Sequence, residues 1–216
     1  MTFSRPIRIA VCADFMVRPQ PTGTQTFMVN LVKQWLLRHP DRVQITLFAT
    51  AGHDLDRLDG ILPPGPWKKR RYGHAYWPSR IGWLYGRCSV RPIIGTHDVF
   101  ISGWHYPLGR HDRPFLAVLH DLRPLEEASA RGSWPSLREM AWDWLAVKSV
   151  RECCRRAERI VCVSDHTRNH LVRFAGPGVE RKCTTVYHGI DPDPWRSPVN
   201  EDALRTVLER DRKSVV

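Results

Sequence analysis

Polar residues that could bind or react with a ligand stand directly after several short apolar runs in this sequence. The apolar run at residues 115–120 ends in His120, and Asp121 follows it. Apolar runs of this length are typical of buried strands, and in a parallel sheet ligands bind beyond the carboxyl ends of the strands. An imidazole can bind a ligand through a hydrogen bond, and a neighbouring carboxylate can orient the ring. We therefore predict that His120 and Asp121 are catalytic; the alternative is a structural His–Asp pair.

A second candidate site is the loop Thr22–Gly23–Thr24. Apolar residues recur at helical spacing from Phe27 to Trp35, so a helix begins near this loop. The N-terminus of a helix offers free backbone N–H groups and a partial positive charge, and phosphate groups bind there. We predict that Thr22, Gly23 and Thr24 contact a phosphate; the alternative is an ordinary turn between a strand and a helix.

Three further candidates follow later apolar runs. Ser164 ends the run at residues 159–164, just before a predicted helix, so it could either cap that helix or contact a ligand. Gly189 and Asp191 follow the run at residues 184–187. We predict that all three line a ligand site; the alternative for Gly189 and Asp191 is a turn into a linker.

A pair of histidines stands on the predicted helix at residues 165–174. His166 and His170 are four residues apart, which is a spacing that can hold a metal ion. The sequence offers no evident third ligand. We therefore favour a solvated helix face for this pair and predict no metal site.

These candidates come together only if the apolar runs form one sheet. Runs and helical patterns alternate along the chain, which favours right-handed crossovers and a parallel sheet. Ser136 and Glu139 form a capping box at the start of a long helix, in which apolar residues recur at helical spacing from Leu137 to Ala157. The predicted fold is an α/β, Rossmann-like, doubly wound sheet with strands at residues 7–15, 43–50, 98–102, 115–120, 159–164 and 184–187.

Composition limits the class of protein. The chain has 216 residues, of which 42% are hydrophobic, and it contains neither an apolar run long enough to span a membrane nor a signal peptide. None of its six cysteines forms a C-x-x-C pair, and Cys12 and Cys162 lie in apolar runs. We expect core thiols in a reducing, cytoplasmic protein.

The formal net charge of +11 is unevenly distributed. Residues 60–97 contain no acidic residue, and within them Trp67–Arg91 mixes aromatic with basic residues. Such a segment suits an anionic membrane surface or single-stranded nucleic acid. A third possibility is a basic loop that packs against another domain.

Several segments together resemble one family. Residues 156–171 and 184–195 are similar to the end of the N-terminal domain of family 4 glycosyltransferases, which have the GT-B fold. Residues 117–127 resemble the H-D-L segment of the mannosyltransferase-like branch, and residues 20–27 stand where the family has a glycine-rich loop. That loop has paired glycines in the family, whereas this sequence has Thr22–Gly23.

The resemblance implies a function and a domain organisation. It implies a retaining glycosyltransferase that moves a sugar from a nucleotide-sugar, with GDP-mannose as the suggested donor, to a glycan or lipid-linked acceptor of a surface polysaccharide. It places His120 against the donor sugar and implies no metal cofactor. It also favours a peripheral contact with the inner membrane face, through Trp67–Arg91, over nucleic acid.

Residues 1–191 would be the acceptor-side domain, residues 192–210 the linker and the start of a missing donor-side domain, and residues 211–216 a tail that reads like a translated sequencing adapter. On this interpretation the chain alone is inactive. Two alternatives are a nucleic-acid-binding module and a half-transferase that acts with a separate donor-binding subunit.

Overall fold

The computed structural model describes most of the chain. The described residues are 5–20, 22–87, 89–105, 113–122, 125–126, 136–189, 201 and 205, without the side chains of 74–77 and 93. Asp191 and the predicted linker and tail lie outside them, apart from Glu201 and Arg205.

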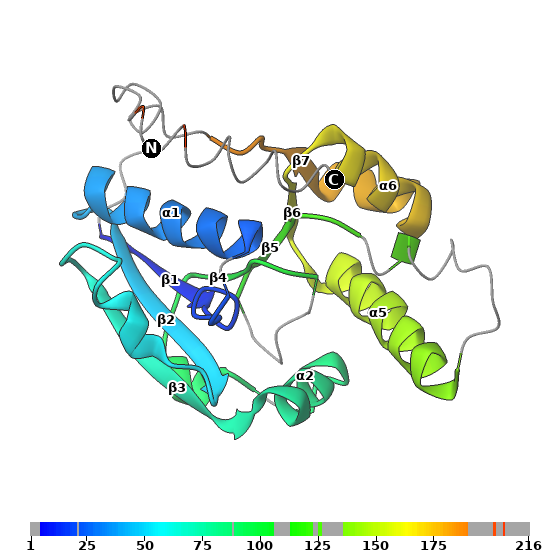
Figure 1. The fold of residues 1–216 in the computed structure, drawn as a ribbon, viewed down its shortest axis with the longest axis horizontal. Helices are drawn as coiled ribbons and strands as arrows, with labels where there is room; N and C mark the ends of the chain where they lie inside the picture. The colour runs from blue at the N-terminus through cyan, green and yellow to red at the C-terminus, as the bar shows by residue number, and fades with distance from the viewer. Residues whose placement is uncertain are drawn as a thin grey trace.

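A single parallel sheet organises the described residues (Figure 1). Its strand order is β3-β2-β1-β4-β5-β6-β7, so the order reverses between β1 and β4. This Rossmann-like, doubly wound arrangement confirms the predicted fold class. The strands are β1 (Ile7–Cys12), β2 (Val43–Ala51), β3 (Trp67–Ala75), β4 (Val99–Ser102), β5 (Phe115–Leu119), β6 (Arg159–Cys162) and β7 (Cys183–Thr185).

Helices cover both faces of the sheet. In Figure 1, α1 lies on one side of the strands, and α2 and α5 lie on the other. The α-helices are α1 (Gly23–Arg38), α2 (Tyr76–Leu84), α3 (Arg91–Ile94), α5 (Leu137–Arg156) and α6 (Asp165–Ala175), and the 3-10 helices are η1 (Leu55–Leu58) and η2 (Pro177–Lys182). No helix among the described residues is both long and apolar enough to cross a membrane.

Two hydrophobic cores result from the alternation of side chains along the strands. Ile9 and Val11 of β1 belong to the core beneath α1, whereas Ala10 and Cys12 face the core formed with α2 and α5. Cys12 and Cys162 are both buried and free, as predicted for core thiols. Burial, together with the nearby Asp14 charge, raises the pKa of the Cys12 thiol to about 12.

The long helix α5 begins as predicted and is buried only in part. Ser136 and Glu139 form the predicted capping box. Only the second half of the helix contributes buried residues, among them Val150 and Cys153. The first half extends past the sheet (Figure 1), and its large apolar side chains are exposed: Leu137, Met140, Trp142 and Trp144.

The basic segment forms an edge strand and a helix that the sequence pattern did not reveal. Strand β3 pairs with β2, and Lys69 bonds to both Asp56 and Asp59 at 2.7 Å. Tyr72 and Trp83 are buried in the core. Part of Trp67–Arg91 therefore builds the core, and part of it pairs with acidic residues in η1 and at its C-cap, while the membrane contact through this segment stays a prediction.

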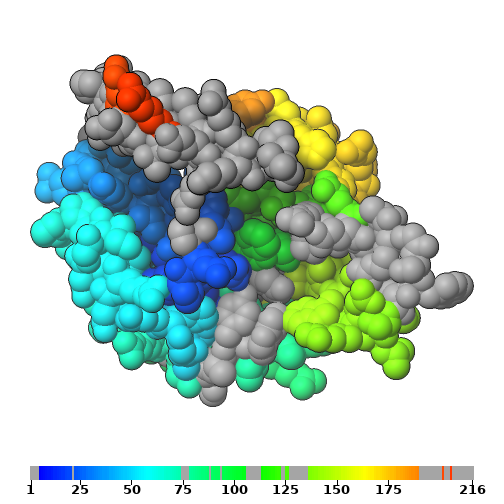
Figure 2. Space-filling view, in the orientation of Figure 1, coloured from blue at the N-terminus to red at the C-terminus, as the bar shows by residue number. Residues whose placement is uncertain are grey.

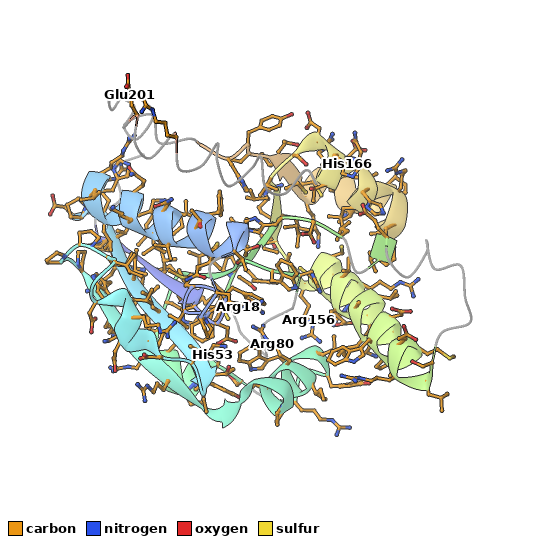
Figure 3. All side chains as sticks on the ribbon, viewed as in Figure 1. Arg18, His53, Arg80, Arg156, His166 and Glu201 are labelled. Atoms are coloured by element: carbon orange, nitrogen blue, oxygen red, sulfur yellow. The ribbon has the colours of Figure 1, made fainter. Side chains whose placement is uncertain are left out.

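A buried ion pair joins the ends of β1 and β2 to α2. Arg80, labelled in Figure 3, donates through Nη2 to Asp14 Oδ2 at 2.8 Å, and both side chains are almost fully buried. Asp14 Oδ1 accepts from the Thr50 backbone N–H at 2.7 Å and from its hydroxyl at 3.1 Å. Arg156 of α5 then donates to the carbonyl oxygens of Trp83 and Leu84, at 2.7 Å each, which fixes the end of α2. These bonds attach α2 firmly to the carboxyl edge of the sheet.

Replacing one member of this pair tests its role. Arg80→Met should lower the free energy of unfolding by about 3–5 kcal/mol, because it leaves the buried Asp14 carboxylate without its cation. Urea denaturation followed by circular dichroism measures this. The double variant Asp14→Asn/Arg80→Met should recover part of the loss. A loss below about 0.5 kcal/mol for Arg80→Met, the range of ordinary surface substitutions, would contradict the assignment.

A glycine allows α1 to pack closely on the end of β4. A Cβ atom at Gly103 would lie 2.7 Å from Met28 Cγ and 2.8 Å from Met28 Sδ, and Met28 is fully buried. Gly103→Ala should therefore destabilise the fold by about 1–3 kcal/mol through overpacking. Thermal unfolding would show the effect, with Gly60→Ala as the control because a Cβ there meets nothing within 4 Å. Equal melting temperatures for the two variants would refute this packing argument.

Candidate functional site

The carboxyl edge of the sheet gathers the predicted site residues. At the point where the strand order reverses, the segments after β1 and β4 meet: Phe15 stacks on Trp104 with ring centroids 5.3 Å apart. Such switch points are where open α/β sheets bind their ligands. In the space-filling view, the blue surface of the segment after β1 adjoins green surface from the middle of the chain (Figure 2). The edge at which these segments meet is therefore where sheet topology predicts a ligand site.

The N-terminus of α1 lies at this edge. Thr22 is the N-cap, and its hydroxyl accepts the backbone N–H of Gln25 at 3.2 Å. The Gln25 side chain donates to the Met16 carbonyl at 3.0 Å, which ties the helix start to the segment after β1. Among the described residues, no partner takes the backbone N–H groups of Gly23 and Thr24. The space around Gly23 is open, since a Cβ there would meet nothing within 4 Å. These two N–H groups can therefore donate hydrogen bonds to an anion.

His120 stands at the end of β5 in an aromatic cluster. Its ring lies edge-on to Phe27 of α1, with centroids 5.1 Å apart, and 5.4 Å from the ring of His188, which itself stacks on Phe27 at 4.7 Å. Burial, with a smaller contribution from the His188 charge, lowers the pKa of His120 to about 4. The ring is therefore neutral near pH 7. Its Nε2 atom is buried and has no hydrogen-bond partner among the described residues.

The backbone at His120 is fixed by α6. Thr167 Oγ1 donates to the His120 carbonyl oxygen at 3.2 Å. Ser164 is the N-cap of α6, and its hydroxyl accepts the Thr167 backbone N–H at 3.1 Å. Of the two roles considered for Ser164, capping is thus observed. A ligand contact by Ser164 stays a prediction.

The remaining predicted residues are less closely joined to His120. Asp121 is exposed, and the ring contacts of His120 include Phe27 and His188. Gly189 is exposed beside His188. Asp191 lies outside the described residues.

Sequence reasoning missed three members of this cluster. Phe27 was assigned only to the apolar face of a helix, Thr167 was not singled out, and His188 was considered only as part of a turn. The available signal was the position of His188 directly after the last strand, where a polar residue is expected to reach the carboxyl edge. Phe27 follows Gly23 by one helical turn, roughly 6 Å along the axis, so α1 places the two free N–H groups and the His120 contact on one edge.

The histidine pair on α6 has a neighbour that the sequence did not reveal. Glu126 Oε1 lies 2.9 Å from His170 Nδ1 and 3.6 Å from His166 Nε2. The expectation that no third ligand stands near these histidines was therefore wrong, because the turn after β5 brings a distant carboxylate to α6.

Comparison with known proteins agrees with this geometry. The structure is similar to the crystal structure of HepE from Anabaena in complex with UDP, with a TM-score of 0.51 and 14% sequence identity. The similarity covers 94% of this chain and 50% of HepE, so the chain spans about half the length of that protein. No curated protein matches the chain. The family model named Glycosyltransferase Family 4 matches residues 21–194. Since that match covers most of the chain, including α1, His120 and α6, this protein belongs to glycosyltransferase family 4.

Proposed function

We propose that this chain is the acceptor-side half of a glycosyltransferase that moves a sugar from a nucleotide-sugar to an acceptor bound at the carboxyl edge of the sheet. The observation that carries the proposal is the neutral, half-buried His120, whose Nε2 has no partner among the described residues. It stands on the same edge as the free N–H groups of Gly23 and Thr24. The choice of sugar transfer as the reaction at this edge comes from membership of glycosyltransferase family 4.

The proposed roles follow from the charges that develop during transfer. The bond between the anomeric carbon and the diphosphate breaks through an oxocarbenium-like transition state, as in glycoside hydrolysis, and negative charge accumulates on the leaving phosphate. The N–H groups of Gly23 and Thr24, at the positive end of α1, would stabilise that charge without reorganising. The neutral His120 ring would hydrogen-bond the transferred sugar. Asp121, being exposed, is assigned to the acceptor.

The identity of the donor is a finer proposal. HepE was solved with UDP, which supports a nucleotide-sugar as the donor class. We propose mannose as the transferred sugar, GDP as the leaving group, a retaining outcome and a role in surface polysaccharide synthesis, from the family branch that residues 117–127 resemble. UDP-sugars are the competing donors, and a donor panel separates the two.

The proposal includes a second domain. Because the chain spans about half of HepE, the rest of the nucleotide-sugar site would come from further residues of the same polypeptide or from a partner subunit. The nucleic-acid alternative receives less support, since Lys69 of the basic segment is already paired with Asp56 and Asp59.

Substitution of His120 tests the proposed site in the complete enzyme. His120→Ala should lower kcat/KM by roughly 100-fold or more, in the range observed for loss of one aimed donor. The assay follows release of UDP or GDP from a panel of nucleotide-sugars. His120→Gln, which keeps a hydrogen-bonding group, should recover part of the activity.

The matched control is His39→Ala, since His39 is an exposed histidine at the far end of α1. This variant should keep full activity. Full activity of His120→Ala would exclude the proposed contact with the sugar. Absence of nucleotide release from every donor by the unaltered enzyme would exclude the transferase function.

We also propose that the lipid-linked acceptor reaches this domain from an anionic membrane surface. The supporting patch, called here the α2–α5 patch, is exposed and apolar, with Lys148 Nζ 4.6 Å from the Tyr85 ring centroid and 5.2 Å from that of Trp144. Amphipathic aromatic residues beside a cation suit the interface of a bilayer. The patch consists of Ile81, Tyr85, Leu137, Met140, Trp144 and Lys148. Ile81 and Tyr85 belong to the predicted contact segment Trp67–Arg91, and the residues of α5 extend it.

Vesicle binding tests this contact. The chain should sediment with phosphatidylglycerol vesicles and less with phosphatidylcholine vesicles. Leu137→Ser/Trp144→Ser should reduce binding at least fivefold, because both side chains are more than half exposed. Leu37→Ser, at a similarly exposed apolar position on α1, is the control and should bind normally. Equal loss in the control, or binding that does not depend on the patch, would contradict the assignment.

A further inference from the structure

Glu126, His166 and His170 form a compact cluster on the outer side of the site. Each offers one ligand atom, and these three atoms all lie within 4.8 Å of one another. The two histidines are one turn apart on α6 and therefore on the same helix face, with His166 labelled in Figure 3. Glu126 lies in a helical turn that comes after β5 and His120 in the chain.

We propose that this cluster binds a divalent transition metal ion of the zinc class. Two imidazole nitrogens and one carboxylate oxygen are a donor set that such ions prefer over Mg²⁺ or Ca²⁺. Tetrahedral zinc with ligands at 2.0–2.2 Å needs ligand atoms roughly 3.3–3.5 Å apart. The distances from Glu126 Oε1 to His170 Nδ1 and His166 Nε2, 2.9 and 3.6 Å, lie on either side of that range. The fourth position is left for water.

The backbone that carries Glu126 is already held in place. The backbone N–H groups of Leu125 and Glu126 donate to the Leu122 carbonyl oxygen at 2.8 and 3.3 Å. Leu122 and Leu125 are buried in the core. The carboxylate therefore stands on an anchored turn, while the exposed His166 ring is free to rotate toward a metal. Little ordering is needed to complete the site.

The bound ion would tie the chain after His120 to α6. Thr167, between the two histidines, already bonds to the His120 carbonyl oxygen. A metal on Glu126, His166 and His170 would add a second link between the same two segments. We assign the ion a positioning role for the turn that carries His120, with no part in the transfer step. Metal binding itself does not depend on the proposed function.

Metal titration of tag-free protein tests the site. Zinc sulfate is titrated against the chain in competition with a chromophoric chelator, and cobalt(II) is used for absorption spectra. Wild-type protein should bind one zinc ion per chain with micromolar or tighter affinity. His166→Ala and His170→Ala should each weaken binding at least tenfold, and Glu126→Gln should weaken it at least threefold.

A control variant and the cobalt spectrum distinguish binding at this cluster from binding to other histidines or to cysteines. His39→Ala removes an exposed histidine elsewhere and should leave the affinity unchanged. The cobalt spectrum should lack the near-ultraviolet thiolate band, because no cysteine belongs to the cluster. Affinity within twofold of wild type in all three variants, no binding at 100-fold excess zinc over protein, or a thiolate band would each overturn the proposal.

Discussion

Seven strands that run in the same direction must end at the same edge of the sheet, and this constraint places the start of α1 and the end of β5 at one edge. The strand order reverses between β1 and β4. The segments that follow these two strands are in contact there, because Phe15 stacks on Trp104. On either side of that point stand the start of α1 and the end of β5. Residues separated by almost a hundred positions thereby reach one edge, as Phe27 and His120 do.

Burial determines the electrostatic character of that edge. The Asp14 carboxylate is acceptable in the interior because Arg80 and Thr50 satisfy it. Among the residues that the structure describes, His120 Nε2 has no such partner, and burial lowers the pKa of the ring so that it is neutral near pH 7. The positive end of α1 is left to attract the anionic part of a ligand. A neutral ring beside an anion-binding helix end fits a reaction in which a sugar leaves a diphosphate.

The sequence predicted most of the fold because local signals were consistent with it. The strands other than β3 were recognised from their apolar runs, and the Ser136–Glu139 capping box marked the start of α5. Strand β3 was missed because an edge strand rich in lysine and arginine has no apolar run, and its stability comes from pairing with β2 and η1. The exposure of the first half of α5 could not be predicted, since helical spacing shows which residues share a face but not whether a partner covers it. His188, Thr167 and Glu126 join their neighbours only through tertiary contacts, which no local pattern contains.

The central claim is that the carboxyl edge between α1 and β5 is the reaction site. The measurement that tests it most directly is a crystal structure of the complete enzyme with its donor nucleotide. We predict that a phosphate of the nucleotide lies within hydrogen-bonding distance of the Gly23 and Thr24 backbone N–H groups, and that the position of the transferred sugar faces His120 Nε2. A nucleotide bound at the opposite edge of the sheet, or one that leaves both of these groups without contact, would contradict the account.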